Sequence, residues 1–246
     1  MLGRLLDVLF PNRCAGCGYG PWPFCAGCGA QLIALVPPWC ERCGVPWGEA
    51  RPRCSECPPP EIDVARAPFL FHGPARHAVH RLKFAGWRRV ASALGGAMVA
   101  VWPPAAEIDA VTWVPLSRRR LAERGFDQAR ALAEAVGAAS SLSTVPLLER
   151  TVDLSPQARR TGAERRAAMA EAFRPVGSCP PRVLLVDDVL TTGATAGACA
   201  RALRAAGARH VTVLTAARAV SAPLHARYTA RGLTPGSVVA RGTSSR

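Results

Sequence analysis

Residues 182–195 read RVLLVDDVLTTGAT, and this stretch decides the fold that we expect. A run of β-branched residues and leucines ends in two adjacent carboxylates, Asp187 and Asp188, and an alanine-rich helical pattern begins at Ala194. A strand–loop–helix turn of this kind directs backbone N–H groups and a helix N-terminus at one point, where a phosphate can bind. The stretch therefore predicts a phosphate site at the carboxyl end of a strand in an open α/β sheet.

The residue types in this stretch suit a ligand that carries both a phosphate and hydroxyl groups. Carboxylates accept hydrogen bonds from ligand hydroxyls. Threonine hydroxyls donate to phosphate oxygens, and a glycine lets the backbone approach closely. The alternative is an ordinary Asp cap with threonine turn residues, but a cap needs only one such residue. The candidate binding residues are Asp187, Asp188, Thr191, Thr192, Gly193, Ala194 and Thr195, and the two aspartates are also the candidate catalytic residues.

Length and composition bound the class of protein. The 246 residues can hold one standard domain plus a small one, and a hydrophobic fraction of 49% is ample for a core. No apolar run is long enough to span a bilayer, and residues 1–10 lack the cleavage site of a secretory signal. We therefore expect a cytoplasmic protein that meets a membrane only through partners. Leucines 2, 5, 6 and 9 share a helical face and predict a short N-terminal helix.

The net charge is +14, and Lys83 is the only lysine beside thirty arginines. An arginine-coated surface from biased codon usage and attraction to polyanions both explain the excess. The retained lysine suggests a need for a compact point charge or a tunable pKa. The alternative is a lysine stem packed on Phe84 and Trp87. Lys83 is therefore a further candidate binding residue.

Eight of the ten cysteines form four Cys-x-x-Cys pairs in the first 57 residues. Two such pairs complete a tetrahedral four-thiolate zinc site with no open position. Disulfides would need an oxidising compartment, and a redox dithiol is normally single and lies within a βαβ unit. We expect two structural zinc ions, with sequential pairing as the simplest arrangement and crossed pairing still open. The candidate ligands are Cys14, Cys17, Cys25 and Cys28 for one ion and Cys40, Cys43, Cys54 and Cys57 for the other.

Strand and helix patterns alternate after the cysteines, which favours a parallel sheet covered by helices on both faces. We expect residues 1–60 to form an N-terminal helix and a zinc domain, residues 61–218 the sheet domain, and residues 219–246 a disordered tail. The expected strands are 64–71, 110–114, 143–148 and 210–215, besides the strand that begins at Arg182 and ends in the acidic pair, and the expected helices are 73–84, 92–101, 121–136 and 194–206.

The order of these features resembles the ComF family of competence-associated proteins. Its members join an N-terminal double zinc ribbon to a domain like the type I phosphoribosyltransferases. Residues 182–195 resemble the phosphoribosyl-diphosphate (PRPP) signature, which implies that the acidic pair holds the ribose 2′- and 3′-hydroxyls and that the loop wraps the 5′-phosphate. The resemblance runs from Cys14 to Arg218 and includes the stretches HRLKF (80–84), WVPLSRRRLAERGFDQ (113–128) and residues 157–173.

Two positions depart from the family pattern. Asp127 stands where the family usually has Asn, and Ala168 stands where Asn is common. Both bear on whether a bound ligand turns over. In the arginine-rich stretch, Arg118 and Arg124 are candidates for the diphosphate, with a solvated helix start as the alternative.

The resemblance implies two functions. The first is an enzyme that binds PRPP with Mg²⁺ and transfers phosphoribose to an unknown nitrogen acceptor. The second is a non-catalytic module that handles single-stranded DNA during uptake and uses PRPP as a bound or regulatory ligand. The implied partners are single-stranded DNA and DNA-uptake helicase or recombination proteins, and the oligomeric state is not predicted.

Overall fold

A parallel β-sheet forms the centre of the molecule. The computed structural model describes residues 13–102, 107–151 and 172–230. Four strands lie in the order β1-β7-β6-β3, and β2 pairs with β7 farther along the same edge. All the pairings in this sheet are parallel, as expected from the alternating pattern. The strands are β1 Val64–Arg66, β2 Phe69–Leu70, β3 Ala110–Trp113, β6 Arg182–Leu190 and β7 His210–Arg218.

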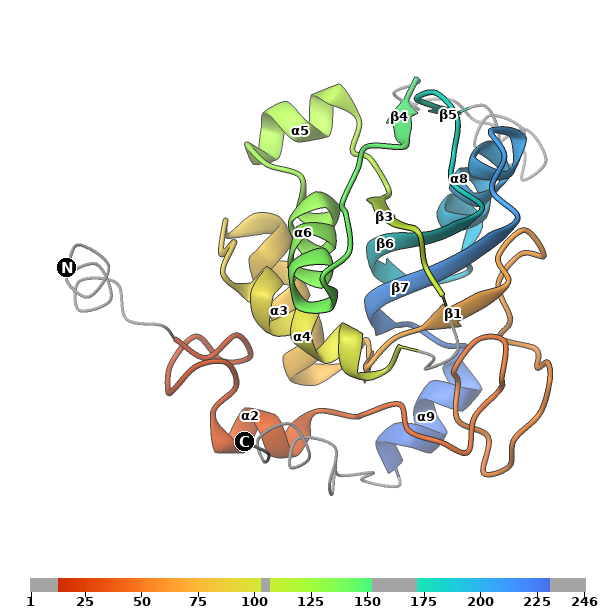
Figure 1. The fold of residues 1–246 in the computed structure, drawn as a ribbon. Helices are drawn as coiled ribbons and strands as arrows, with labels where there is room; N and C mark the ends of the chain where they lie inside the picture. The colour runs from red at the N-terminus through yellow and green to blue at the C-terminus, as the bar shows by residue number, and fades with distance from the viewer. Residues whose placement is uncertain (1–12, 103–106, 152–171, 231–246) are drawn as a thin grey trace, which may run out of the picture.

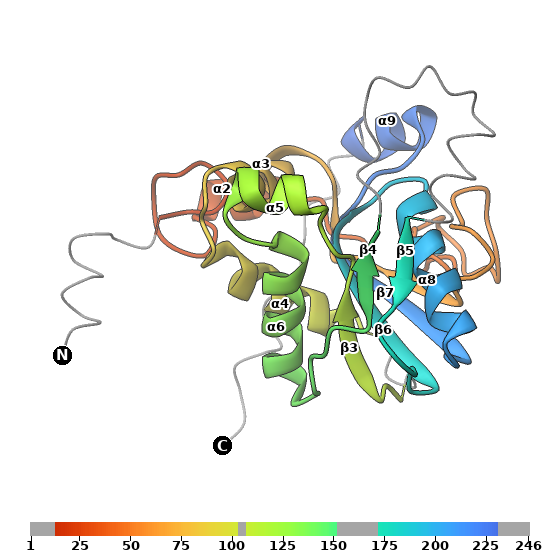
Figure 2. The same cartoon turned by 90° about the horizontal axis from the view of Figure 1, so that it is seen from above.

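Helices cover both faces of this sheet, which confirms the expected layered α/β class (Figure 2). On one face, Leu82, Leu94 and Leu132 pack against Leu184 and Leu214 of the sheet. The alternate residues of the same strands face α8 in a second core. The helices are α3 Gly73–Phe84, α4 Val90–Ala100 and α6 Gln128–Ser140 on the first face and α8 Ala194–Ala205 on the second.

The central strand β6 runs past the point where one neighbour stops. The last β3 residue, Trp113, pairs with Val186, whereas β7 stays beside β6 until Leu190 meets Arg218. The acidic pair therefore lies inside a nine-residue strand rather than at its end, which corrects the expectation from the sequence. Because β3 has already ended, this edge of β6 has no paired strand at this point among the described residues.

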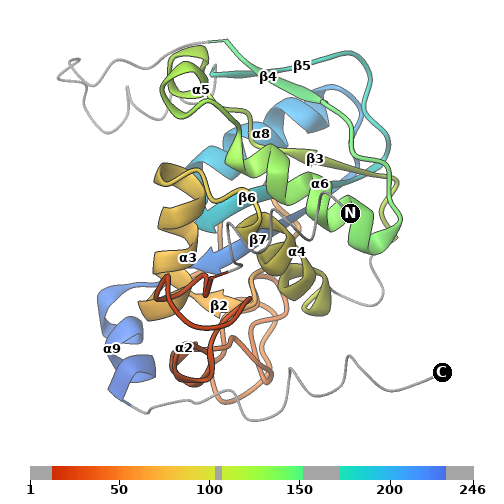
Figure 3. The same cartoon turned by 90° about the vertical axis from the view of Figure 1, so that its left-hand side faces the viewer.

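The cysteine-rich segment is built mainly of turns and contains one short helix, α2 Ala26–Gln31. It lies along the sheet and α3, next to a C-terminal helix, α9 Ala222–Ala230 (Figures 1 and 3). Leu224 and Tyr228 of α9 are buried. The expectation of a disordered tail is therefore wrong for residues 222–230, because these two side chains pack against apolar residues of the cysteine-rich segment and β2. Residues 231–246 lie outside the described residues.

Some element boundaries differ from the expected ones. The strand expected at 64–71 is divided into β1 and β2 around Pro68, which has no N–H to donate to a ladder. The helix expected at 121–136 is two helices, α5 Arg118–Arg124 and α6, because Gly125 takes a left-handed φ of 71°.

The strand expected at 143–148 makes only an isolated bridge to β3 through Thr144. The chain then forms a small antiparallel pair, β4 Leu148–Arg150 with β5 Phe173–Pro175. The expected N-terminal helix and Ala168 lie outside the described residues. Among the described helices, none combines the length and the apolar character needed to cross a membrane.

Candidate functional site

Strand alternation sends the two candidate carboxylates to opposite faces of β6. Asp188 is only 5% exposed and faces α3 and α6. Its Oδ2 lies 2.8 Å from Nζ of Lys83 and accepts a hydrogen bond from Nε2 of Gln128 at 3.2 Å. Lys83, on the last turn of α3, therefore reaches the acidic pair, as a binding role would require.

Asp187 faces α8 on the other side of the strand. Burial raises the pKa of this carboxyl well above its usual value, and the neighbouring Asp188 carboxylate acts in the same direction. A hydrogen bond of 2.8 Å from the Asp188 N–H to Asp187 Oδ1 opposes the shift. Asp187 is thus held toward its neutral form, and a ligand that brings hydroxyl donors or a cation would favour the ionised form.

A short chain of contacts extends from Asp188 to the arginine-rich stretch. Gln128 receives a hydrogen bond of 2.8 Å from Arg124 on its Oε1 while its amide donates to Asp188. The Arg124 guanidinium lies 5.0 Å from the ring centre of Phe84, which is 67% exposed. Arg124 therefore belongs to the site, whereas Arg118 is exposed at the first residue of α5.

Gln128 was not among the candidate residues from the sequence. The signal that could have identified it is its place at the end of the stretch 113–128, where a buried glutamine starts α6.

Asp127, which replaces the usual Asn, caps α6. Its Oδ1 accepts hydrogen bonds from the N–H groups of Ala129 at 2.9 Å and Arg130 at 3.1 Å. Its Oδ2 accepts a third from the Leu116 N–H at 3.1 Å. An Asn side chain has only one acceptor oxygen, so the aspartate fits all three donors and ties α6 to the chain that leaves β3. The change from Asn therefore has a structural role here.

The loop after β6 leads directly into the N-terminus of α8. Thr191 and Thr192 are exposed and Thr195 is half-buried, so their hydroxyls are accessible to a ligand. Gly193 is the N-cap, with a left-handed φ of 78° and no side-chain cap. The Ala194 N–H has only a long contact of 3.4 Å to Thr192 Oγ1. The first turn of this helix is therefore available to an anion.

The eight paired cysteines form two groups of four. Cys14, Cys17, Cys25 and Cys28 make one group and Cys40, Cys43, Cys54 and Cys57 the other, with ligand atoms within 4.8 Å of one another. This is the sequential pairing. Sγ–Sγ separations within the groups include 3.4, 3.6, 3.8 and 4.0 Å.

These separations fit zinc and not disulfides. A tetrahedron with Zn–S bonds of about 2.3 Å has edges of about 3.8 Å. A disulfide would need a separation of about 2.05 Å. All ten cysteines are free thiols in the structure.

A pocket of about 620 Å³ lies between the first cysteine group and α3. Its lining includes Cys17 and Cys28 from the ribbon and His77, His80, Arg81 and Phe84 from the helix. The pocket therefore combines ring faces with positive charge, and it shares Phe84 with the surroundings of the acidic pair.

Comparisons with known proteins agree with this organisation. A double zinc ribbon domain model matches residues 5–58. The "DNA utilization protein YhgH" of Salmonella typhi is 29% identical over 208 residues, which are 78% of this chain and 88% of that protein. "Competence protein F" of Haemophilus influenzae is 26% identical over 208 residues, with 79% and 90% covered. "Competence protein ComFC" of Streptococcus pneumoniae is 34% identical over 106 residues, 43% of this chain and 46% of that one.

Two solved structures are similar at a lower level. The first, titled "Structure of the allosteric regulatory enzyme of purine biosynthesis", has a TM-score of 0.38 and 22% identity over 56% of this chain and 30% of that one. The second, the protein TT1426 from Thermus thermophilus, has a TM-score of 0.32 and 24% identity, with 58% and 79% covered. Similarity at this level adds nothing to what the strand order and layers already establish. Homologues named YhgH and competence protein F match over most of the chain, and together with the ComFC match and the N-terminal double zinc ribbon they bear out the resemblance to the ComF family.

Proposed function

We propose that this protein binds PRPP together with Mg²⁺ and transfers the phosphoribosyl group to a nitrogen acceptor. The observation that supports this most directly is the continuity of β6, the threonine loop and α8. Two carboxylates, one of them with a raised pKa, stand next to exposed threonines and an uncapped helix N-terminus. One ligand that carries both sugar hydroxyls and a phosphate would bind the carboxylate pair through its hydroxyls and the threonine loop through its phosphate.

In this proposal the two parts of the site hold different ends of the ligand. The 5′-phosphate binds at residues 191–195, where the helix N-terminus and the threonine hydroxyls supply donors. The ribose hydroxyls donate to Asp187 and Asp188 at the edge of β6 beyond the end of β3. The ion pair between Lys83 and Asp188, at 2.8 Å, offsets the negative charge of Asp188 at this point.

The reaction would exchange one bond for another at the anomeric carbon. The bond from that carbon to the diphosphate oxygen breaks, and its electron pair leaves with the diphosphate. The acceptor nitrogen then donates its lone pair to the carbon and releases a proton to solvent. Mg²⁺ would neutralise charge on the diphosphate, and Arg124 is the nearest described arginine in the contact chain of the acidic pair. The carboxylates stabilise the positive ribosyl ring through its hydroxyls.

Calorimetry with PRPP and Mg²⁺ tests the binding site. We expect wild type to bind and the Asp187→Asn/Asp188→Asn variant to lose at least tenfold in affinity, or about 1.4 kcal/mol. Asp109→Asn is the matched control, because Asp109 pairs with Arg182 at the opposite end of β6. Equal affinity in wild type and in the double variant would overturn the site. Release of diphosphate with nitrogenous acceptors then separates an enzyme from a binding protein.

A second candidate function is the handling of single-stranded DNA, with PRPP as a bound or regulatory ligand. The observation that favours it is the exposed ring of Phe84, next to His80 at 5.6 Å between ring centres and beside the pocket with Arg81. Base stacking on an aromatic ring contributes about 1–3 kcal/mol per base. DNA-uptake helicase or recombination proteins in the cytoplasm would then be natural partners.

Fluorescence anisotropy with labelled oligonucleotides tests this candidate. We expect salt-dependent binding that Phe84→Ala weakens by about fivefold or more, consistent with the loss of one stacked base. Val176→Ala is the control, because Val176 is also an exposed apolar residue but lies beside β5. The absence of binding at low salt, or an equal effect of both variants, would contradict the DNA function.

A further inference from the structure

Two arginines are buried against the second cysteine group. Arg66 at the end of β1 is 7% exposed, and Arg218 at the end of β7 is 2% exposed. Arg66 donates to the carbonyls of Ala65 and Glu41, and Arg218 donates to those of Leu190, Thr191 and Glu56. Within the described ranges, neither forms an ion pair with a carboxylate. Each also has a buried Nε without a hydrogen-bond partner.

With zinc bound, the second cysteine group would supply the negative charge that these two arginines lack. Four thiolates on one Zn²⁺ carry a net charge of −2, which balances two guanidinium groups. Burial lowers the pKa of Arg218, and the charges of Cys43, Glu56, Cys54 and Cys57 raise it. Burial likewise lowers the pKa of Arg66, while Cys43 and Cys40 raise it. The two arginines and the metal group are therefore stabilising partners.

Only one of the two arginines also touches the threonine loop. Arg218 Nη1 donates to the Leu190 carbonyl at 3.2 Å and to the Thr191 carbonyl, at the point where β6 becomes the loop. Its Nη2 donates to the carbonyl of Glu56, which lies inside the Cys54-x-x-Cys57 turn. One planar guanidinium thus joins the metal-binding turn to the start of the loop.

A second connection follows directly along the chain after Cys57. Pro58 and Pro59 lie against the loop so closely that a Cβ on Gly193 would be 2.8 Å from Pro58 Cβ and 2.9 Å from Pro59 Cδ. A Cβ on Gly197, one turn into α8, would lie 3.0 Å from Pro59 Cβ. The two glycines permit this approach, and the prolines support the loop.

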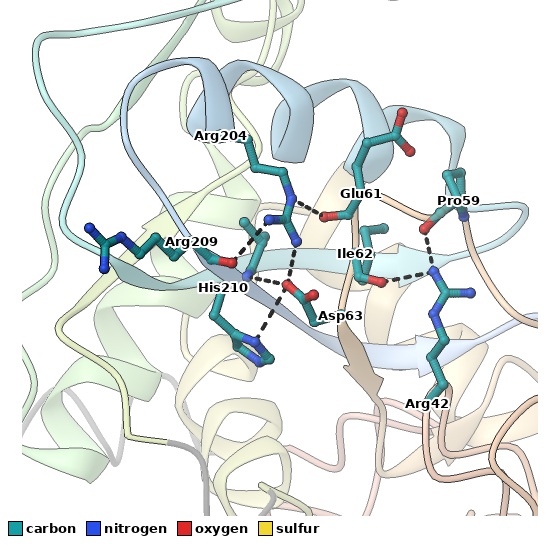
Figure 4. Close-up of polar contacts among 9 residues, drawn as sticks. Arg42, Pro59, Glu61, Ile62, Asp63, Arg204, Arg209 and His210 are labelled. Carbon is teal, nitrogen blue, oxygen red and sulfur yellow. Dashed lines mark hydrogen bonds and ion pairs between the residues drawn. The ribbon is translucent and has the colours of Figure 1, made fainter.

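The chain after the prolines is fastened to the rest of the sheet domain (Figure 4). Arg42 from the ribbon donates to the carbonyls of Pro58 at 2.8 Å, Pro59 at 2.6 Å and Ile62 at 2.8 Å. Asp63 Oδ2 accepts from Arg204 of α8 at 2.6 Å and from the Val211 N–H of β7 at 2.7 Å. Residues 58–63 are therefore held at one end by the ribbon and at the other by α8 and β7.

We propose that Arg218 is a positioning residue that couples the second cysteine group to the loop 191–195, so that zinc bound at Cys40, Cys43, Cys54 and Cys57 keeps the phosphate site in shape. Loss of zinc there removes the charge partner of Arg218 and loosens the Glu56–Arg218–Thr191 connection. Loss of zinc from the first group, which has no such connection among the described contacts, leaves the loop unchanged. For its ligand-binding consequence, the inference rests on the proposed function.

The test compares Arg218→Lys with Arg66→Lys in zinc-saturated full-length protein. Both variants keep the positive charge beside the metal group, but only Arg218→Lys removes a guanidinium fork that reaches the loop. The first readout is amide hydrogen exchange of residues 190–197, which needs no ligand. The second is calorimetry with ribose 5-phosphate, a probe of the phosphate site without diphosphate. We expect at least tenfold faster exchange and at least tenfold weaker binding for Arg218→Lys, and wild-type values for Arg66→Lys.

Removal of metal completes the test. Cys57→Ser should accelerate exchange in residues 190–197, and Cys25→Ser should not. Wild-type exchange in both Arg218→Lys and Cys57→Ser would overturn the coupling, as would equal effects of the two arginine variants. If Cys57→Ser does not fold, the comparison of Arg218→Lys with Arg66→Lys still tests the coupling. If wild type binds neither ribose 5-phosphate nor PRPP while the exchange results hold, the proposed function fails and the coupling stands.

Discussion

Gly193 gives the sharpest test of the contact between the ribbon and the threonine loop. Its φ of 78° is left-handed, and an alanine there would cost roughly 1–2 kcal/mol in backbone conformation alone. The new Cβ would also lie 2.8 Å from Pro58 Cβ and 2.9 Å from Pro59 Cδ, well inside van der Waals contact. Overpacking of this kind costs about 1–3 kcal/mol. We therefore expect Gly193→Ala to lower the free energy of unfolding by about 2–5 kcal/mol.

Gly177→Ala is the matched control. Gly177 has nearly the same φ, 82°, but nothing lies within 4 Å of the position that its Cβ would take. The conformational cost is then shared by both variants, and their difference measures the contact with the two prolines. Urea denaturation in the presence of zinc gives the free energy of unfolding of each variant, and ribose 5-phosphate binding gives the effect on the site. If Gly193→Ala costs no more than Gly177→Ala, the prolines do not support the loop.

Three further predictions concern Asp187, the zinc sites and helix α4. Because the pKa of Asp187 is raised in the folded protein, the contribution of this carboxyl to stability is fully present below the unfolded carboxyl pKa of about 3.9 and is lost as pH rises through the folded value. Asp187→Asn should therefore gain stability over wild type from pH 4 to pH 8, as measured by urea titrations. Metal analysis should find two zinc equivalents; fewer than one would contradict the thiolate sites. Gly96→Ala, where a Cβ in α4 meets nothing, should raise the free energy of unfolding by about 0.5–1 kcal/mol, and a loss would be unexpected.

The sequence predicted correctly those elements whose boundaries are determined by residues close to them in the chain. The helix 73–84 has the predicted boundaries, because a proline at its start and apolar residues at helical spacing determine it without help from distant residues. The Cys-x-x-Cys spacing likewise identified both cysteine groups. The break at Gly125 was missed because a glycine inside a helical pattern is usually tolerated, and here Asp127 caps a new helix directly afterwards.

The parts of the site that the sequence did not reveal depend on contacts between distant residues. Gln128 became part of it only because α6 lies beside β6 and brings the amide to Asp188. Arg218 was expected beyond the end of a strand, but β7 continues to it because β6 does, and the guanidinium then reaches Thr191. Helix α9 was missed because its two apolar residues stabilise nothing until the ribbon covers them. No local pattern carries that information.

The packing joins the three segments that the sequence separates. Leu35 and Val45 from the cysteine-rich segment, Leu70 from β2, and Leu224 and Tyr228 from α9 belong to one buried cluster. The Tyr228 hydroxyl also donates to the Pro46 carbonyl, so the C-terminal helix is attached to the ribbon by a polar contact as well. Since the segment has too little apolar surface to fold alone, the second ribbon needs both the sheet domain and α9. The cysteine-rich segment, β2 and α9 therefore form one packed unit, and this unit supports the loop that Arg218 contacts.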